Sequence, residues 1–295
     1  MTELSIVIVS YNVCSYLRES IRSVITASQN IDCEIVVVDN HSSDDSVSMV
    51  EGEFDNIRLI VSENNEGFAS ACNKGIVASS GEFVLILNPD TVVSHDSLEE
   101  AMTFMRQHPE AGAIGARMTD GNGVFLPESK RGFPSPFTSF FRFSGIWKFF
   151  SKSPVFNRYY LGNFPDHLTC RADILTGAFM FIRREALNRA GLFDTSFFMY
   201  GEDIDLSWRI IRAGYINYYV PSVRITHFKG KSASSDDPAR VRHFYEAMII
   251  FTRKHLRFYW HLPVVTMIYL MLEFRLLVTW FRRRFKKKTP VVKNG

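Results

Sequence analysis

Cysteine and glycine are both scarce in this chain. Its 295 residues include four cysteines and 17 glycines, fewer glycines than the 26 phenylalanines. The cysteines, Cys14, Cys33, Cys72 and Cys170, show no CxxC spacing, and three of them fall within apparent helix or strand patterns. We therefore expect free buried thiols and a reducing compartment. Because no basic segment precedes the first apolar run, we also expect no signal peptide.

Two familiar glycine-rich phosphate loops are missing as well. No GxGxxG sequence follows the first predicted strand, which excludes a dinucleotide-binding fold of that type. Gly230, Lys231 and Ser232 match the end of a P-loop, but Ile225 stands where the motif requires its first glycine. Neither of the common glycine-loop nucleotide sites is therefore expected.

Negative charge is nearly absent from the C-terminal part of the chain. Residues 239–295 have a net charge of +11, so residues 1–238 carry −8 of the overall +3. A nucleic-acid-binding protein concentrates positive charge on its folded domain. We therefore expect no nucleic acid partner, and predict an acidic domain over 1–238 followed by a basic helical tail over 239–295.

The apolar fraction of 46% and the charged fraction of 22% are typical of globular proteins and exclude a disordered chain. Strand patterns occur at 5–10, 34–38, 57–61 and 83–87, and a helical pattern at about 68–78 precedes the last of them. This alternation predicts an α/β fold with right-handed crossovers and an open, mostly parallel sheet flanked by helices. Such sheets bind ligands at the carboxyl ends of their strands.

The pattern changes beyond residue 110. An Asp-Gly-Asn-Gly sequence at 120–123 predicts a hairpin turn. Residues 133–164 contain twelve aromatic residues and no acidic residue, and match neither the helix nor the strand period. Strands are predicted at 175–182 and 216–220, and a helix at 202–212.

Short polar motifs stand in a fixed order along these elements. They are Tyr11-Asn12, Asp39-Asn40, Asn65-Glu66-Gly67 with Asn73, Asn88-Pro89-Asp90, Gly177, Gly201-Glu202-Asp203 and His227. The ordered set closely resembles family 2 glycosyltransferases of the GT-A fold, and within them the bacterial rhamnosyltransferase-like subset, over about residues 4–235. The donor half would cover about 1–118 and the acceptor half about 119–238.

The resemblance implies a nucleoside diphosphate sugar as donor. Tyr11, Asn12 and Asp39 match positions that hold the nucleobase and ribose, and a carboxylate suits a ribose hydroxyl because it only accepts hydrogen bonds. A turn-forming role is the alternative for Asp39. Asn65, Gly67 and Asn73 match a donor-facing segment, where Gly67 would allow a close backbone approach. Capping or solvent exposure is equally compatible with Asn73.

Asn88-Pro89-Asp90 occupies the place of the family's Asp-x-Asp metal motif. Mg²⁺ and Mn²⁺ prefer oxygen ligands and bind through one or two carboxylates when a diphosphate supplies others. The resemblance implies that Asp90 holds such a divalent cation, with Asn88 on the donor side. His227 matches a late family histidine that completes the metal shell, and Lys231 would add positive charge near the diphosphate. A plain Pro-Asp turn is the alternative for Asp90.

Asp203 is the predicted catalytic base. A carboxylate at a helix start is stabilised in its ionised form and can accept the proton of an acceptor hydroxyl. The resemblance places Gly177 and Glu202 on the acceptor side. The alternative is that the acidic residues are only N-terminal helix charges, and Asp205 with Arg209 is predicted to form such an i,i+4 ion pair.

The segment 262–281 is long enough to span a bilayer. Glu273 and Arg275 near its middle make spanning costly, so an interfacial helix followed by a basic run is favoured over a span. A core helix with a solvated tail is the alternative. We expect a cytoplasmic enzyme associated peripherally with the inner leaflet of the cytoplasmic membrane.

Together these features predict an inverting, metal-dependent glycosyltransferase of bacterial surface polysaccharide synthesis with a saccharide or lipid-linked acceptor. The subset resemblance favours dTDP-rhamnose as donor, and another donor such as a UDP-hexose is the alternative. A nucleotidyltransferase would need a glycine- and arginine-rich loop near the first strand, which residues 11–15 do not provide. A non-enzymatic membrane scaffold would bind no nucleotide.

Overall fold

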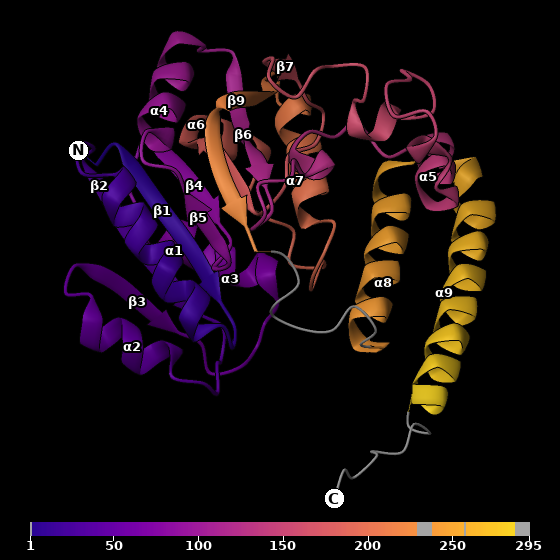
Figure 1. The fold of residues 1–295 in the computed structure, drawn as a ribbon, viewed down its shortest axis with the longest axis horizontal. Helices are drawn as coiled ribbons and strands as arrows, with labels where there is room; N and C mark the ends of the chain where they lie inside the picture. The colour runs from indigo at the N-terminus through magenta and orange to yellow at the C-terminus, as the bar shows by residue number, and fades with distance from the viewer. Residues whose placement is uncertain (1, 229–237, 257, 287–295) are drawn as a thin grey trace, which may run out of the picture. The chain divides into compact units, whose positions relative to one another are not determined.

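The computed structural model describes residues 2–228, 238–256 and 258–286. The chain divides into two compact units (Figure 1). Unit 1 comprises Met1–Phe198 and Glu202–Ser232, and unit 2 comprises Met199–Gly201 and Ala233–Gly295. Each unit has its own hydrophobic core.

The first half of unit 1 is the predicted parallel sheet. Strands β1 (Leu4–Ser10), β2 (Cys33–Asp39), β3 (Ile57–Val61) and β4 (Phe83–Leu87) pair in parallel in the order β3-β2-β1-β4. The continuous apolar run of β1 follows from burial on both faces, since alternate side chains enter two different cores. This arrangement brings the carboxyl ends of β1, β2 and β4 to one edge of the sheet.

Helices cover both faces of this sheet (Figure 1). One core receives side chains from α1 (Cys14–Ala27), α2 (Ser46–Glu53) and α4 (Ser97–Gln107). The other receives them from α3 (Phe68–Val77), α6 (Arg184–Ala190) and α7 (Glu202–Arg212). The three layers leave the strand ends as the place where polar side chains can meet.

The second half of unit 1 adds strands of both directions. The order continues from β4 through β8 (Phe179–Arg183), β6 (Ala111–Thr119), β9 (Ile216–His227) and β5 (Thr91–Val93), and β7 (Cys170–Arg171) pairs with β9. β8 is antiparallel to both β4 and β6, whereas β6 and β9 are parallel. The sheet is therefore mixed in this half.

Two strands in this half differ from their predicted bounds. The strand predicted at 175–182 begins only at Phe179, because the backbone at 175–177 bonds to side chains of α7 instead of to a neighbouring strand. The strand predicted to end at residue 220 continues to His227. Pro221 falls in an irregularity of the β6–β9 ladder, between the pairs Ala116–Val220 and Arg117–Arg224. A bulge tolerates a proline that a regular central strand would not.

Shorter elements and turns complete unit 1. The turn predicted at 120–123 is confirmed, with Asp120 N–H donating to Val124 O and Thr119 pairing with Phe125. The connection that follows contains η1 (Pro127–Ser129), α5 (Pro136–Ser144), η2 (Ile146–Lys148) and η3 (Arg158–Tyr160). All four cysteines are free, as predicted, but only Cys72 and Cys170 are buried. The other two, at the start of α1 and of β2, lie where packing is incomplete.

Unit 2 is a pair of helices, α8 (Pro238–His255) and α9 (Phe258–Lys286). They pack through a small core of Val241, Tyr245, Ile249, Ile268 and Leu272. The segment Leu262–Trp280 of α9 is long and apolar enough to cross a membrane, and 22% of it is buried within the protein.

Candidate active site

Asp39 lies at the carboxyl end of β2 and is 1% exposed. Its Oδ2 accepts a hydrogen bond from Ser42 N–H at 2.8 Å, so the turn role considered for it is real. Its Oδ1 is buried and has no hydrogen-bond partner among the described residues. Because an unpaired buried carboxylate oxygen costs free energy, this atom is suited to accept a hydrogen bond from a ligand.

Asn12 joins the loops that follow β1 and β2. Its backbone is left-handed (φ +55°), its N–H donates to Ser42 Oγ at 2.9 Å, and its Oδ1 accepts from Ser43 N–H at 2.7 Å. The neighbouring Tyr11 side chain is 45% exposed at the same edge. Asn12 thus braces the two loops, while the Tyr11 ring is presented to solvent.

Asn65 and Gly67 extend this edge toward α3. Asn40 Nδ2 donates to Asn65 Oδ1 at 3.0 Å and to Gly67 O at 3.2 Å. Gly67 has φ +85°, and a Cβ there would lie 2.5 Å from Phe198 O, so a side chain cannot be accommodated. The close approach predicted for Gly67 is thus made to the protein's own backbone. We call Asn12, Asp39, Asn40, Asn65 and Gly67 the β1–β2 edge.

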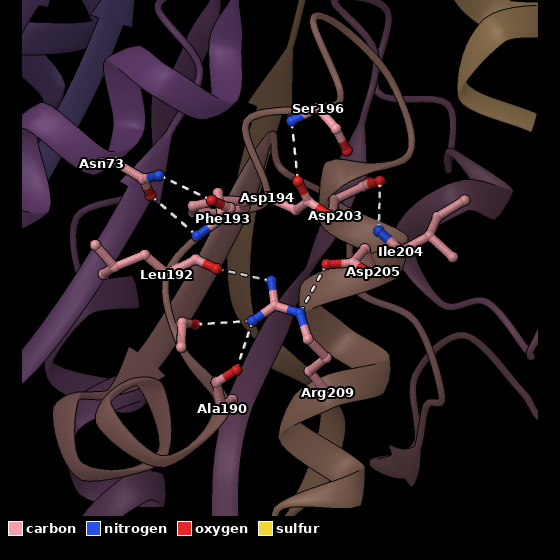
Figure 2. Close-up of polar contacts among 11 residues, drawn as sticks. Asn73, Ala190, Leu192, Phe193, Asp194, Ser196, Asp203, Ile204, Asp205 and Arg209 are labelled. Carbon is pink, nitrogen blue, oxygen red and sulfur yellow. Dashed lines mark hydrogen bonds and ion pairs between the residues drawn. The ribbon is translucent and has the colours of Figure 1, made fainter. Parts of the chain in front are cut away.

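Asn73 fixes the loop that leads to α7 (Figure 2). Its Nδ2 donates to Phe193 O at 2.8 Å and its Oδ1 accepts from Phe193 N–H at 3.0 Å. From the other side, Arg209 donates to the carbonyls of Ala190 and Leu192. The predicted pair of Asp205 with Arg209 is confirmed at 2.7 Å. Both amide atoms of Asn73 are therefore engaged in positioning this loop.

Asp90 and His227 meet at the end of the sheet, although 136 residues separate them in the chain. The antiparallel pairing of β5 with β9 places Thr91 opposite His227, and His227 Nε2 lies 3.1 Å from Asp90 Oδ1. Both residues are at most 8% exposed, and His227 Nδ1 has no partner among the described residues. The Asn88 side chain is half-buried beside them, and its backbone N–H donates to Ala178 O.

This pair fits a divalent cation. Neighbouring ligands of an octahedral Mg²⁺ ion, each about 2.1 Å from the metal, lie about 3 Å apart, which is the separation of the two side-chain atoms here. Within the described ranges, no group of three or more His, Cys, Asp or Glu residues is close enough to hold an ion. Oxygen atoms of a bound diphosphate would complete such a shell.

Asp203 occupies the first turn of α7. Its Oδ2 accepts from Arg131 at 2.6 Å and from Gly177 N–H at 3.3 Å. Its Oδ1 accepts from Ile204 N–H at 2.8 Å, as Figure 2 shows. The Arg131 and Asp203 side chains are only 11% and 13% exposed. Arg131 also donates to Leu175 O. We call Arg131, Gly177, Glu202 and Asp203 the Arg131–Asp203 cluster.

Burial and the neighbouring charges shift the pKa values of Arg131 and Glu202 in this cluster. Burial alone would lower the pKa of Arg131, but the adjacent Asp203 carboxylate more than offsets it, and the pKa is raised. Burial and the charge of Asp203 raise the pKa of Glu202 to about 8, and Glu202 Oε2 has no partner among the described residues. Glu202 is therefore mainly protonated at neutral pH, and the carboxyl group that pairs with Arg131 is that of Asp203.

The structure thus brings together Asp39 with Asn12, Asp90 with His227, and Asp203 with Gly177. Lys231 lies outside the described residues. Arg131 is the residue that the sequence reasoning missed, because 72 positions separate it from Asp203. Asn40 was also given no role, although its place next to Asp39 was a usable signal.

Similarity to a known family assigns the chain. The family model described as glycosyl transferase family 2 matches residues 5–191. The chain belongs to this family. It is a glycosyltransferase, as the resemblance predicted.

Individual relatives agree with this assignment. An N-acetylglucosaminyl-diphospho-decaprenol L-rhamnosyltransferase of Mycobacterium tuberculosis is 26% identical over 88% of this chain and 87% of that protein. The low-salt glycan biosynthesis hexosyltransferase Agl10 of Haloferax volcanii is 29% identical over 72% of this chain and 62% of its own length. Among solved structures, the mannosyltransferase PcManGT of Pyrobaculum calidifontis, in complex with GDP-Man and Mn²⁺, aligns with a TM-score of 0.59 and 18% identity. That alignment covers 98% of this chain and 76% of PcManGT, and the fold is the predicted GT-A type.

Proposed function

We propose that this glycosyltransferase transfers a sugar, by an inverting displacement, from a nucleoside diphosphate donor held at the β1–β2 edge. The observation that carries the proposal is the Asp90–His227 pair. This pair would supply ligands for a cation, and the β1–β2 edge of the same sheet carries the unpaired Asp39 oxygen. The rhamnosyltransferase relative favours dTDP-rhamnose as the donor and a lipid-linked saccharide as the acceptor. The hexosyltransferase relative makes a UDP-hexose the competing donor.

The donor half of the site binds and orients. Asp39 Oδ1 accepts a hydrogen bond from a ribose hydroxyl or a base imide, which gives the buried atom its missing partner. The half-exposed Tyr11 ring stacks on the base. Asp90 and His227 would hold a Mg²⁺ or Mn²⁺ ion, which when bound would supply positive charge to the diphosphate.

The acceptor half moves the proton. Asp203 accepts the proton of the acceptor hydroxyl as its oxygen forms the bond to the anomeric carbon and the bond to the diphosphate breaks. Attack on the face opposite the leaving group inverts the anomeric configuration. Arg131, Gly177 N–H and Ile204 N–H fix the orientation of the carboxylate, and Oδ1 keeps a lone pair for the proton.

Unit 2 is proposed to attach the enzyme to the cytoplasmic face of a membrane. The outer side of α9 exposes Leu262 (79%), Leu270 (67%), Phe274 (69%) and Trp280 (50%). A run of arginine and lysine follows in the sequence at 282–288. An apolar helix side next to basic residues is typical of a helix that lies in the interface of an anionic bilayer. Glu273 also lies on the exposed side, which favours this arrangement over a span.

A nucleotide panel tests the proposed donor site. We expect dTDP or UDP, in the presence of Mn²⁺, to raise the melting temperature of the full-length protein, and the better of the two identifies the donor class. Asp39→Asn is the matched variant, since its amide oxygen keeps the Ser42 bond while an NH₂ group replaces the orphan oxygen. The shift should fall strongly in this variant. No shift with any nucleoside diphosphate would contradict the proposal and favour a non-enzymatic scaffold.

A further inference from the structure

The connection after β6 exposes a group of phenylalanine rings on unit 1. Phe149 is 86% exposed, Phe140 60%, Phe137 56% and Phe150 51%. Single exposed apolar residues are common on soluble proteins, but a contiguous patch indicates an interaction site. These four residues, with the half-buried Phe141 and Phe156, are called the aromatic surface here.

Five of the six rings of the aromatic surface, all except that of Phe149, are joined by ring contacts into one group. The Phe141 ring lies 4.6 Å from that of Phe137, 5.5 Å from that of Phe140 and 4.9 Å from that of Phe156. The Phe156 ring in turn lies 4.8 Å from that of Phe150. The exposed rings of α5 and of the segment after η2 are therefore joined through two partly buried rings.

A second group of contacts joins the elements that carry the aromatic surface to one another. Arg142 lies 4.7 Å over the Tyr159 ring, and its Nε donates to Tyr160 OH at 3.1 Å. The Trp147 and Tyr160 rings are 4.8 Å apart. These contacts tie α5 and η2 to η3, which lowers the entropic cost of using the exposed rings for binding.

The charged residues of the chain segment that carries the aromatic surface are all positive. No Asp or Glu occurs between Glu128 and Asp166, and Lys148, Lys152 and Arg158 are exposed within that stretch. Interfaces between proteins are depleted in lysine, whereas exposed aromatic rings next to lysine and arginine are typical of segments that enter the headgroup region of anionic bilayers. The charge favours a negatively charged bilayer as the occupant over another protein.

The aromatic surface is connected to the Arg131–Asp203 cluster through three consecutive residues. Lys130 Nζ donates to Leu161 O at 3.4 Å, and Gly132 N–H donates to Tyr159 O at 2.9 Å, which holds the end of the aromatic stretch. Between them, Arg131 donates to Asp203. The Arg131–Asp203 cluster is therefore tied directly to the segment that carries the aromatic surface.

We propose that the aromatic surface of unit 1 is a second bilayer-docking site, which places the Arg131–Asp203 cluster at the headgroup layer where a lipid-linked acceptor presents its sugar. The inference rests on the proposed lipid-linked acceptor and deepens it. It assigns membrane contact to the catalytic unit itself, independently of α9. Because α9 and the aromatic surface belong to one chain, their contributions to membrane affinity multiply, and loss of either one weakens membrane binding.

Sedimentation of the full-length protein with vesicles tests the inference. The vesicles contain phosphatidylcholine alone or phosphatidylcholine with phosphatidylglycerol. We expect Lys148→Gln/Lys152→Gln to bind the anionic vesicles about 25-fold more weakly, since each basic residue near such a surface contributes roughly fivefold. Phe149→Ser/Phe150→Ser should weaken binding at least about tenfold. The matched controls are Val77→Ser, 73% exposed on α3, and the exposed Arg212→Gln.

Two results would overturn the inference. Binding of both double variants equal to that of the controls would overturn the inference. So would light scattering that shows a dimer broken by Phe149→Ser/Phe150→Ser with vesicle binding unchanged, because the occupant would then be a second copy of the chain. The nucleotide-induced thermal shift should be equal in all variants, and its absence from the unmodified protein would contradict the proposed function instead.

Discussion

The β1–β2 edge and the Arg131–Asp203 cluster are built on different physical principles. Along the β1–β2 edge, polar side chains accept hydrogen bonds from backbone N–H groups of neighbouring loops, as Asp39 does from Ser42. In the Arg131–Asp203 cluster, a buried arginine balances a carboxylate from a distant part of the chain, and a second carboxyl beside them is kept protonated. We expect the β1–β2 edge, which is held by several such hydrogen bonds, to stay folded when one of its side chains is removed. The Arg131–Asp203 cluster couples charge, stability and pH, so its variants should have larger effects.

The largest expected effect is on catalysis. Asp203→Asn keeps the size and most hydrogen bonds of the side chain but removes the proton acceptor. We expect turnover to fall roughly 10²–10⁴-fold, the usual contribution of a general base, while the nucleotide-induced thermal shift at the β1–β2 edge is retained. Sugar transfer is measured with the donor found in the nucleotide panel. Asp55→Asn, at an exposed position, is the control. Turnover above a few per cent of normal would remove Asp203 from the role.

Arg131→Ala should have the next largest effect, on folding. Removing one partner of a buried ion pair leaves the other charge without compensation and typically costs about 3–5 kcal/mol. The free energy of unfolding is measured by urea titration. Arg158→Ala, at an exposed position, should change it by no more than about 0.5 kcal/mol.

Arg131→Lys separates charge from geometry. Lysine keeps the positive charge but cannot bond Asp203 and the Leu175 carbonyl with the same planar group. We expect this variant to recover part of the stability and less of the turnover. Equal stability of Arg131→Ala and Arg158→Ala would show that the Arg131–Asp203 pair does not hold the cluster together.

Much of the β1–β2 edge could be predicted from the sequence. An apolar run that ends in a polar residue defines both a buried parallel strand and the place of its carboxyl end, so Asp39 could be located without a structure. Asp90 was predicted for the same reason, because the strand Phe83–Leu87 ends just before it. Short-range patterns were sufficient at these positions.

Three features depend on contacts between distant segments, and no local pattern predicts them; only the family resemblance implied that His227 joins Asp90. Arg131 has an ordinary local sequence, and only the fold brings it to Asp203. His227 reaches Asp90 because β9 continues past Pro221 through an irregularity in its pairing with β6, whereas proline normally indicates the end of a strand. The raised pKa of Glu202 follows from burial, which helix periodicity alone did not show.

A smaller effect is expected at the cation site. Asp90→Asn removes the charged ligand and leaves His227 in place. Loss even of an outer partner of a metal ligand typically lowers metal affinity about 10–100-fold, so the Mn²⁺ concentration needed for the nucleotide-induced shift should rise at least about tenfold. Asp96→Asn, whose side chain is 84% exposed, is the control. An unchanged Mn²⁺ requirement would show that the cation binds elsewhere.

The finest test concerns pH and the Glu202 carboxyl of the Arg131–Asp203 cluster. The pKa of Glu202 is raised to about 8 in the folded protein, from about 4.3 in an unfolded chain. A raised carboxyl pKa contributes stability that is fully present below about pH 4.3 and is lost as the pH rises through about 8. Over that window Glu202 keeps its proton in the folded state and loses it in the unfolded state, so its contribution lowers the free energy of unfolding by about 1.4 kcal/mol per pH unit. Glu202→Gln cannot titrate and should abolish this slope, which urea titrations between pH 5 and 8 would measure. Glu185→Gln, at an exposed position on α6, should leave the slope unchanged. If Glu202→Gln and Glu185→Gln give the same slope, the pKa of Glu202 is not raised in the folded protein.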